Sequence, residues 1–139
     1  MTRLSLSESQ QGLLGRMRNA VLATTSAGGS PHLAPVWYLW DGSHVRISTT
    51  RSARKVADVR GDPRVAVCVD DQVAGDYLTL YGTASVVEGP GVAELTMPLL
   101  LAYLQPDEAS ARWARLDADN ARVVLLVSPH GAAGRQGVR

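Results

Sequence analysis

Short stretches of apolar residues, several of them alternating with polar residues, recur along the chain and predict β-strands. These stretches are residues 20–25, 31–40, 44–49, 64–70, 77–88 and 121–129. The turn sequences SAGGS (26–30) and DGS (41–43) separate the first three stretches, which are therefore expected to pair as an antiparallel meander. Gly82, inside the fifth stretch, predicts a bulge or a close approach of another strand.

Other segments have the apolar spacing or the boundary residues of helices. They are residues 5–17, 52–61, 92–104 and 107–116. A capping box, formed either by Ser5 or by Ser7 with the residue three positions later, would begin the first helix. Ser52 is the expected N-cap of the second helix, and Pro98 predicts a kink or break in the third. Six or so mostly antiparallel strands and a few helices predict a mainly β protein built as a small barrel.

The chain of 139 residues has the size of a single domain. Hydrophobic residues make up 45% and charged residues 19%, which is typical of a soluble globular protein rather than a disordered one. No apolar run is long enough to cross a membrane, and the N-terminal sequence MTRLSLSESQQ lacks the apolar segment of a secretory signal, so we expect a cytoplasmic protein. The glycine-rich residues 131–139 are expected to form a flexible tail.

Positive charge is concentrated in one part of a nearly neutral chain. Residues 46–64 contain six of the fourteen Lys and Arg residues but only two of the thirteen Asp and Glu residues. This gives the segment a net charge of +4, against +1 for the whole chain. A surface that binds nucleic acid needs a broad basic patch, so the localised charge indicates a small anionic ligand instead.

The stretch TTRSARK (49–55) places Arg54 and Lys55 in the first turn of the predicted helix 52–61. Cations at this position oppose the helix dipole, at a cost of about 0.3–1 kcal/mol each when exposed. A bound anion would reverse that effect, because backbone N–H groups, the Ser52 hydroxyl and the two cations could converge on one phosphate. The alternative is that these cations form the solvated face of a short helix.

The other histidines and aromatic residues form no catalytic pattern. His44 and His130 are too scattered to indicate a metal site. His32 is either a proton donor or a structural residue. Trp37 and Trp40 are expected to be anchors in the core or in a dimer interface. The sequence therefore identifies no catalytic residue and no metal ligand.

Three stretches resemble, in their order and spacing, the pyridoxamine-phosphate-oxidase-like split-barrel flavoproteins. They are LATTSAGGSPHLAPVWYLWDG, HVRISTTRSARKVADVRGDPRVAV and YLTLYGTASVVE. The resemblance covers residues 13–88 and extends only loosely to the C-terminal half. Within the family, the chain is most similar to the short actinobacterial subgroup that uses the deazaflavin coenzyme F420. The resemblance implies a split β-barrel of the FMN-binding type, arranged as a homodimer with the flavin in a groove between the subunits.

The same resemblance implies a set of cofactor-binding residues. Arg54 and Lys55 match the phosphate-binding pair, and Val36 lies on the strand that passes near the flavin ring. The strand end that lines the phosphate pocket contributes Ser48, Thr49 and Thr50, and the adjoining Arg51 and Ser52 complete the expected site. Ala53 stands where many FMN-binding relatives have a serine, which favours F420 over FMN. The carboxylates of the F420 tail could be received by additional nearby cations, namely Arg51, Arg60 and Arg64. The alternative is that these arginines are solvated or pair with Asp58 and Asp62.

The expected function is that of an F420-dependent oxidoreductase, which transfers a hydride from the reduced deazaflavin to a small organic acceptor. The alternatives are an FMN-dependent oxidoreductase of the same fold and a protein that binds flavin, haem or lipid without catalysis. A nucleic-acid-binding domain is disfavoured by the net charge of +1. A true vitamin B6 oxidase is disfavoured because the chain ends VVLLVSPHGAAGRQGVR, without the Trp- and Arg-containing segment that completes the substrate site of those enzymes.

Overall fold

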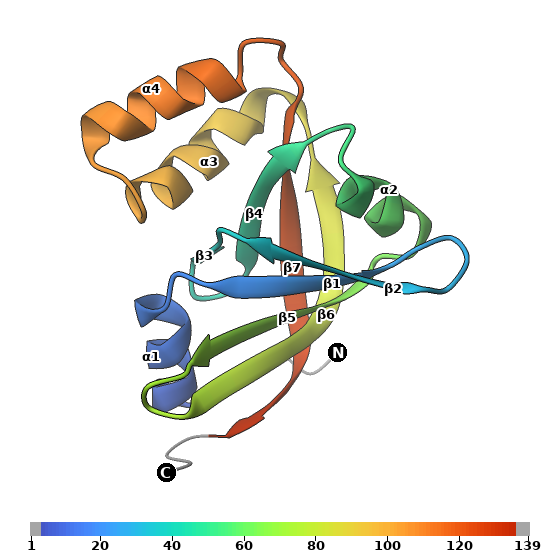
Figure 1. Cartoon of the computed structure of the whole chain (residues 1–139), viewed down its shortest axis with the longest axis vertical. Coiled ribbons are helices and arrows are strands. Elements are labelled where there is room, and N and C mark those ends of the chain that lie inside the picture. The colour runs from blue at the N-terminus through green and yellow to red at the C-terminus, as the bar shows by residue number, and fades with distance from the viewer. Residues whose placement is uncertain (1–3, 136–139) are drawn as a thin grey trace.

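The computed structural model describes residues 4–135 and shows four α-helices, one short 3-10 helix and seven β-strands within that range (Figure 1). The strands are β1 (Ala20–Thr25), β2 (Pro31–Val36), β3 (Leu39–Trp40), β4 (Val45–Thr50), β5 (Arg64–Asp71), β6 (Asp76–Val87) and β7 (Arg122–Arg135). The helices are α1 (Glu8–Arg16), α2 (Arg54–Gly61), η1 (Gly89–Gly91), α3 (Val92–Leu101) and α4 (Pro106–Leu116). None of these helices is long and apolar enough to cross a membrane.

The strands form one curled sheet in the order β2-β1-β5-β6-β7-β4-β3, and every neighbouring pair is antiparallel. The two longest strands, β6 and β7, pair with each other in the middle of this order. Helices α3 and α4 lie together on one side of β4, α2 lies on its other side, and α1 packs toward the opposite end of the sheet (Figure 1). This curled sheet is the half-barrel of a split β-barrel, so the predicted mainly β fold class is confirmed.

Alternate residues of the strands point to the inner side of the curled sheet and form the main core. Five strands contribute Leu22, Ile47, Val67, Leu80 and Leu125, each at most 1% exposed. Removing such side chains from water stabilises the fold by about 25 cal/mol per Å² of buried apolar surface. A second, smaller cluster holds α3 against α4, and its buried members are Leu99, Leu100 and Ala109.

The segment predicted as one strand, residues 31–40, is divided in the structure at Trp37 and Tyr38. Before the break β2 pairs with β1, whereas after it β3 pairs with β4. Tyr38 turns into the core, and its backbone N–H donates to the Tyr103 hydroxyl at 2.8 Å, while that hydroxyl donates back to the Tyr38 carbonyl at 3.2 Å. Both predicted hairpins form, the second one between β3 and β4 around the DGS turn. The three strands are nevertheless not one continuous meander, because the break places β2 and β3 at opposite ends of the strand order.

The helix boundaries follow their capping groups. Ser7 caps α1 and the Gln10 side chain completes the capping box, so the second of the two expected boxes is the one that forms. The N-cap of α2 is Ala53, which makes no side-chain hydrogen bond, so the prediction of Ser52 as the N-cap is wrong. Helix α3 continues through Pro98 for another turn.

The last strand is longer than the sequence predicted. Residues 131–135 of the expected tail belong to β7 and pair with β6, and residues 136–139 lie outside the described range. The pairing of β6 with β7 shifts register between Tyr81 and Gly82. A Cβ atom at Gly82 would collide with the Ser128 backbone oxygen, so the glycine marks both a bulge and a close approach, as predicted.

Candidate functional site

A pocket of about 270 Å³ lies between the outer side of β4 and β7 and the helices α2, α3 and α4. It is lined by Pro35, Val36, Trp37, Ser48, Lys55, Leu99, Leu100, Arg112, Leu116 and Arg122. Three of these residues are cationic and none is acidic, and all the others except Ser48 are apolar or aromatic. An anion with an apolar or aromatic body fits this combination better than a cation does.

Ser48 and Arg122 form the floor of the pocket on neighbouring strands. Both side chains point outward, because Ile47 and Val123, which alternate with them, are fully buried. The Arg122 Nη2 atom donates a 2.8 Å hydrogen bond to Ser48 Oγ, whereas its buried Nε has no hydrogen-bond partner among the described residues. Burial lowers the pKa of Arg122, and the negative charge of Asp119 opposes this shift. An unpaired buried donor costs about 1–3 kcal/mol, so Arg122 has unused binding capacity.

Lys55 reaches the pocket from the first turn of α2. That turn contains no acidic residue, and its N-cap Ala53 provides no side-chain hydrogen bond. Within residues 4–135, no carboxylate lies within ion-pair distance of Lys55 or Arg54. Lys55 and the helix N-terminus therefore present uncompensated positive charge to the pocket. Arg54 is exposed and does not line the pocket, so the two members of the predicted pair occupy different environments.

Three of the eight predicted cofactor-binding residues come together in this pocket, namely Val36, Ser48 and Lys55. Thr49 points into the core and is 6% exposed, because it alternates with Ser48 along β4. The four others lie outside the pocket lining: Thr50, Arg51, Ser52 and Arg54. The sequence motif therefore predicts where the pocket lies, but it does not predict most of the residues that line it.

The three arginines that the sequence offers to the F420 tail are already paired with carboxylates. Arg51 Nε lies 2.8 Å from Glu88 Oε1, and Arg60 Nη2 lies 3.1 Å from Oε2 of the same residue. Hydrogen bonds from both arginines hold the pKa of Glu88 below its usual value. Arg64 binds Asp62 at 2.8 Å and lowers the pKa of that carboxyl to about 2. A ligand carboxylate would have to displace these partners, so the three arginines are less available than the sequence suggests.

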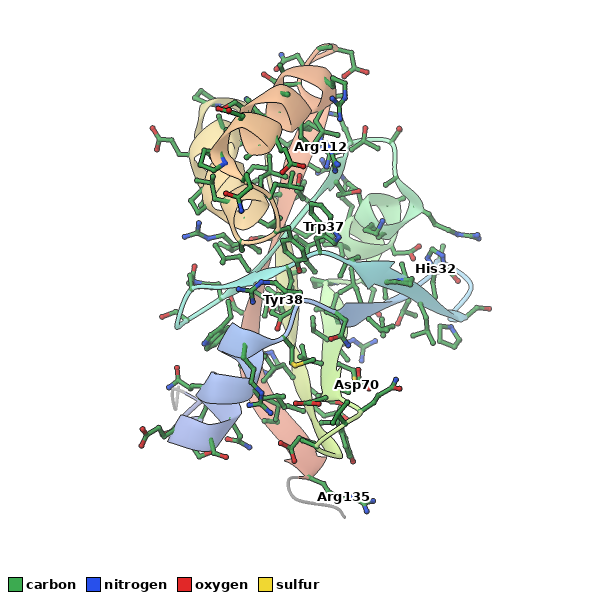
Figure 2. The ribbon with its side chains drawn as sticks, turned by 60° about the vertical axis from the view of Figure 1, so that its left-hand side comes forward. His32, Trp37, Tyr38, Asp70, Arg112 and Arg135 are labelled. Atoms are coloured by element: carbon green, nitrogen blue, oxygen red, sulfur yellow. The ribbon has the colours of Figure 1, made fainter. Side chains whose placement is uncertain are left out.

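Trp37 forms the aromatic edge of the pocket and is held in a stack of side chains. Its ring centroid lies 4.2 Å from that of Tyr103, with 4° between the ring planes. The guanidinium carbon of Arg112 lies 5.4 Å from the Trp37 ring centroid, and that of Arg18 lies 5.9 Å from the Tyr103 centroid. Figure 2 shows Arg112 between the upper helices and Trp37. Such cation–π contacts contribute about 0.5–1 kcal/mol at exposed sites, and here they also fix the position of Arg112.

The sequence does not identify Arg112 and Arg122 as site residues, and it predicts Trp37 mainly as an anchor. Helix α4 and strand β7 lie far along the chain from residues 49–55, and only the folded sheet brings them to the same pocket. One signal is present in the sequence, because Arg122 is the single charged residue in the strand sequence RVVLLV.

A separate polar cluster joins α2 to the β1–β2 hairpin. Asp58 is 6% exposed, accepts a 2.7 Å hydrogen bond from Thr24 Oγ1 and lies 3.2 Å from His32 Nδ1. His32 does not line the pocket at Trp37, and the two residues are well apart in Figure 2. Of the two roles considered for His32, its position favours the structural one. Among the described residues, no group of three His, Cys, Asp or Glu side chains is arranged to hold a metal ion.

The curled antiparallel sheet, with a pocket on the outer side of β4 and β7, defines a split β-barrel protein. The family model for pyridoxamine 5'-phosphate oxidase matches residues 6–134, and the chain therefore belongs to that family. No curated protein sequence matches the chain. The family expected from the sequence is thus confirmed.

Three solved structures are similar to this chain over most of its length. The chain is 26% identical to an F420 reductase, with a TM-score of 0.74, over 92% of this chain and 98% of that one. It is 23% identical to the conserved hypothetical protein Rv2991 from Mycobacterium tuberculosis, with a TM-score of 0.81, over 99% and 89% of the two chains. HutZ, the heme storage protein from Vibrio cholerae, has the same fold at 17% identity and a TM-score of 0.67, over 97% and 99%. Because a reductase and a storage protein share this fold, the pocket residues must distinguish between functions.

Proposed function

We propose that the protein is an F420-dependent oxidoreductase that transfers a hydride from the reduced deazaflavin to a small organic acceptor. The observation that carries the proposal is the pocket, in which Lys55 at an uncapped helix N-terminus faces a wall that ends in Trp37. The bound deazaflavin supplies the hydride, and the protein supplies binding and orientation. The similarity to an F420 reductase supports this choice of cofactor.

The N-terminus of α2 is the proposed phosphate site. Lys55 provides a positive charge without a carboxylate partner, Ser48 provides a hydroxyl, and the first turn of α2 adds the positive end of the helix dipole. Each charge-assisted hydrogen bond contributes about 1.5–3 kcal/mol, which exceeds the unfavourable interaction of one lysine with the dipole. Arg54 is exposed next to Lys55 and is available to parts of the cofactor that extend beyond the pocket.

The segment Pro35–Val36–Trp37 is the proposed wall against the flavin ring. Together with Leu99 and Leu100 it forms an apolar surface that would orient a planar ring and exclude water from it. The pocket lining contains no Asp, Glu or His, so the proposal assigns no side chain as a catalytic acid or base. The buried Arg122 donor without a partner fits an anionic ligand at the floor of this pocket.

A second copy of the chain is proposed to complete the site. A volume of about 270 Å³ is small for a flavin with its phosphate, because sites for ligands of that kind measure about 300–1,000 Å³. The outer face of β2, β1, β5 and β6 carries large apolar side chains that a homodimer would bury, and Val21, Leu33, Tyr77 and Tyr81 are 38–65% exposed. Pro35 lines the pocket and pairs with Val21, so this face continues into the pocket.

An FMN-dependent oxidoreductase of the same fold is the second candidate, because the proposed phosphate site suits both cofactors. Ala53, which makes no side-chain hydrogen bond at the N-cap of α2, favours F420. Haem binding in this pocket is disfavoured by its chemistry. The lining contains no His, Cys, Met or Tyr, which are the side chains that hold haem iron in proteins.

Side-by-side fluorescence titrations of the purified protein with F420 and with FMN test the proposal. We expect F420 to bind at least tenfold more tightly, which corresponds to about 1.4 kcal/mol. Equal or tighter binding of FMN would replace F420 by FMN in the proposed reaction. Failure of both cofactors to bind at micromolar concentration would refute the oxidoreductase proposal altogether.

A further inference from the structure

The pocket holds more positive charge than a single phosphate needs. A phosphodiester carries one negative charge, and Lys55 with the N-terminus of α2 is sufficient to neutralise it. Arg112 and Arg122 remain, and no acidic residue lines the pocket beside them. They come from α4 and β7, and α4 and α2 lie on opposite sides of β4 in Figure 1. Arg112 and Arg122 therefore reach the pocket from different elements of the fold than Lys55 does.

These two arginines also differ from many arginines elsewhere in the molecule. Carboxylate partners within 4 Å are found for Arg16, Arg46, Arg51, Arg60 and Arg64. Within residues 4–135, neither Arg112 nor Arg122 has such a partner, although Asp119 acts on Arg122 from a longer distance. Arg112 contacts the Trp37 ring and Arg122 donates to Ser48 Oγ, and the buried Arg122 Nε has no hydrogen-bond partner in the described part of the chain.

Both guanidinium groups are held in position before any ligand arrives. Arg112 lies over Trp37, whose ring is stacked on Tyr103, and Arg122 is anchored by Ser48 on the neighbouring strand. A guanidinium group offers a planar fork of N–H donors that matches the two oxygens of a carboxylate. A preorganised pair of such groups next to an indole ring suits a ligand with a carboxylate on an unsaturated or aromatic body.

We propose that Arg112 and Arg122 form a second anion subsite, which binds a carboxylate of the hydride acceptor while Trp37 contacts the body of that molecule. The inference rests on the proposed function and narrows its substrate to an organic acid. The carboxylate is not the group reduced. The hydride brings its electron pair to an unsaturated carbon of the acceptor, the π bond at that carbon breaks, and the adjoining atom takes a proton from water. The reduced deazaflavin is oxidised in the same step, and the proton that it loses with the hydride goes to the solvent and replaces the one taken from water.

Isothermal titration calorimetry with 1-naphthoate and the neutral 1-naphthamide tests the subsite without any turnover. Both probes are titrated into the full chain, with and without saturating oxidised F420, so that the phosphate site is occupied in one series. We expect 1-naphthoate to bind at least tenfold more tightly than 1-naphthamide in both series. Arg112→Gln should abolish this preference, and Arg122→Lys should weaken it, because lysine keeps the charge but lacks the planar fork.

The matched control is Arg115→Gln, which removes an exposed arginine of the same helix that does not line the pocket. This variant should keep the full preference for 1-naphthoate. In Arg112→Gln, the dissociation constant for F420 should change by less than threefold. That result would separate the acceptor subsite from the cofactor site.

Three outcomes would overturn the inference in distinguishable ways. Equal binding of the two probes, with F420 bound normally, would reject the subsite and leave the proposed function intact. If Arg112→Gln weakened binding of F420 but not of a deazaflavin phosphate without glutamates, the arginine would serve the cofactor tail and not the acceptor. If the unmodified protein bound no F420, the proposed function would fail, and with it the assignment of the carboxylate to a hydride acceptor.

Discussion

Lys55 occupies a position that is unfavourable for the helix that carries it. It lies in the first turn of α2, where the helix dipole is positive and no acidic residue compensates it. An anion bound at this helix end would turn two repelling positive charges into two attractive interactions. A bound anion should therefore stabilise α2 more than it would stabilise a helix whose N-terminus is capped.

We expect Lys55→Ala to weaken F420 binding by about 1.5–3 kcal/mol, the contribution of a charge-assisted hydrogen bond. The free energy of unfolding without ligand should stay unchanged or rise, because the substitution removes a cation from the helix N-terminus. Arg54→Ala should cause a smaller loss of affinity, since Arg54 is exposed and does not line the pocket. Fluorescence titration and urea unfolding measure the two quantities.

The control for these variants is Arg64→Ala, which removes a cation of the same basic segment that pairs with Asp62 outside the pocket. It should leave F420 affinity within a factor of about two. Unchanged affinity in Lys55→Ala would remove Lys55 from the proposed phosphate site.

At the scale of elements, the Tyr103 hydroxyl takes the place of a missing strand partner. It accepts from the Tyr38 N–H at 2.8 Å and donates to the Tyr38 carbonyl at 3.2 Å, at the point where β2 ends and β3 has not begun. This contact joins the segment between α3 and α4 to the sheet. The same side chain stacks on Trp37, so one residue fixes both the strand break and the aromatic edge of the pocket.

Tyr103→Phe is expected to lower the free energy of unfolding by about 1–3 kcal/mol, because it leaves the Tyr38 N–H without its partner. The ring and its stack on Trp37 remain, so F420 affinity should change by less than a factor of about three. Urea unfolding combined with fluorescence titration measures both effects. An unchanged free energy of unfolding in Tyr103→Phe would mean that water replaces the hydroxyl as the hydrogen-bond partner of the Tyr38 N–H.

The ion pair between Asp62 and Arg64, which follows α2, gives the protein a specific response to acid. Arg64 lowers the pKa of Asp62 from 3.8 to about 2, so the folded state binds this proton less readily than the unfolded state does. The contribution to stability is complete above about pH 4 and is lost as the pH falls towards 2. Asp62→Asn should therefore reduce the fall in the free energy of unfolding across that range.

Urea unfolding at several pH values from roughly 5 to 2, the range set by the two pKa values, measures this difference between Asp62→Asn and the unmodified protein. The effect should be small and should shrink in about 1 M salt, because the Arg64 side chain is 81% exposed and the pair is screened. Identical acid profiles at low salt for both proteins would show that the pair adds nothing to stability.

The elements differ in how well the sequence predicted them. Strand β4 is predictable because its sequence alternates apolar and polar residues, as a half-buried strand must. Strand β1 is predictable as a short β-type run that ends at a turn sequence. Gly82 predicts the bulge and the close approach correctly, because a side chain there would collide with the Ser128 backbone. The break at Tyr38 could not be predicted, since it depends on a hydroxyl 65 positions further along the chain.

The residues that line the pocket are only partly predictable, because some of them also come from distant parts of the chain. Ser48 and Lys55 belong to one local stretch, strand β4 followed by helix α2, so the sequence motif places them together. Val36 ends the separate strand β2, and the family resemblance is what points to it. Arg122 carries one local sign, as the single charged residue of RVVLLV, and Arg112 carries none. Their role follows only from the tertiary fold, in which α3 packs on β4 and β7 and α4 packs on α3, so that two cations from distant parts of the chain line the same pocket.

At the scale of the whole molecule, the exposed apolar face of β2, β1, β5 and β6 is the proposed dimer interface. A stable interface buries roughly 1,200–2,000 Å² in total and has an apolar centre. Leu33 is 65% exposed on this face, and Tyr81 is 49% exposed. Because Pro35 connects the face to the pocket, dimerisation and cofactor binding are expected to depend on each other.

Leu33→Glu should therefore produce a monomer and weaken F420 binding at least tenfold, because a charge would be buried at the interface and the partner would no longer complete the pocket. Sedimentation velocity at micromolar concentration and fluorescence titration measure the two effects. Val73→Glu is the control, since Val73 is 90% exposed in the turn between β5 and β6. An unmodified protein that sediments as a monomer with F420 bound would contradict the proposed interface.

Strand β7 has a consequence for how the protein is made. It pairs with β6 on one side and β4 on the other, so it joins β2-β1-β5-β6 to β4-β3. It follows both of its partners along the chain and lies far from β4 in sequence, which makes the closing step slow. A chain still on the ribosome must keep the free edges of β6 and β4 from pairing with other molecules. Arg122 lies on β7 and enters the pocket in the same step that closes the sheet. The cofactor can therefore stabilise the protein only after β7 has paired, and it cannot stabilise a chain in which β7 is still unpaired.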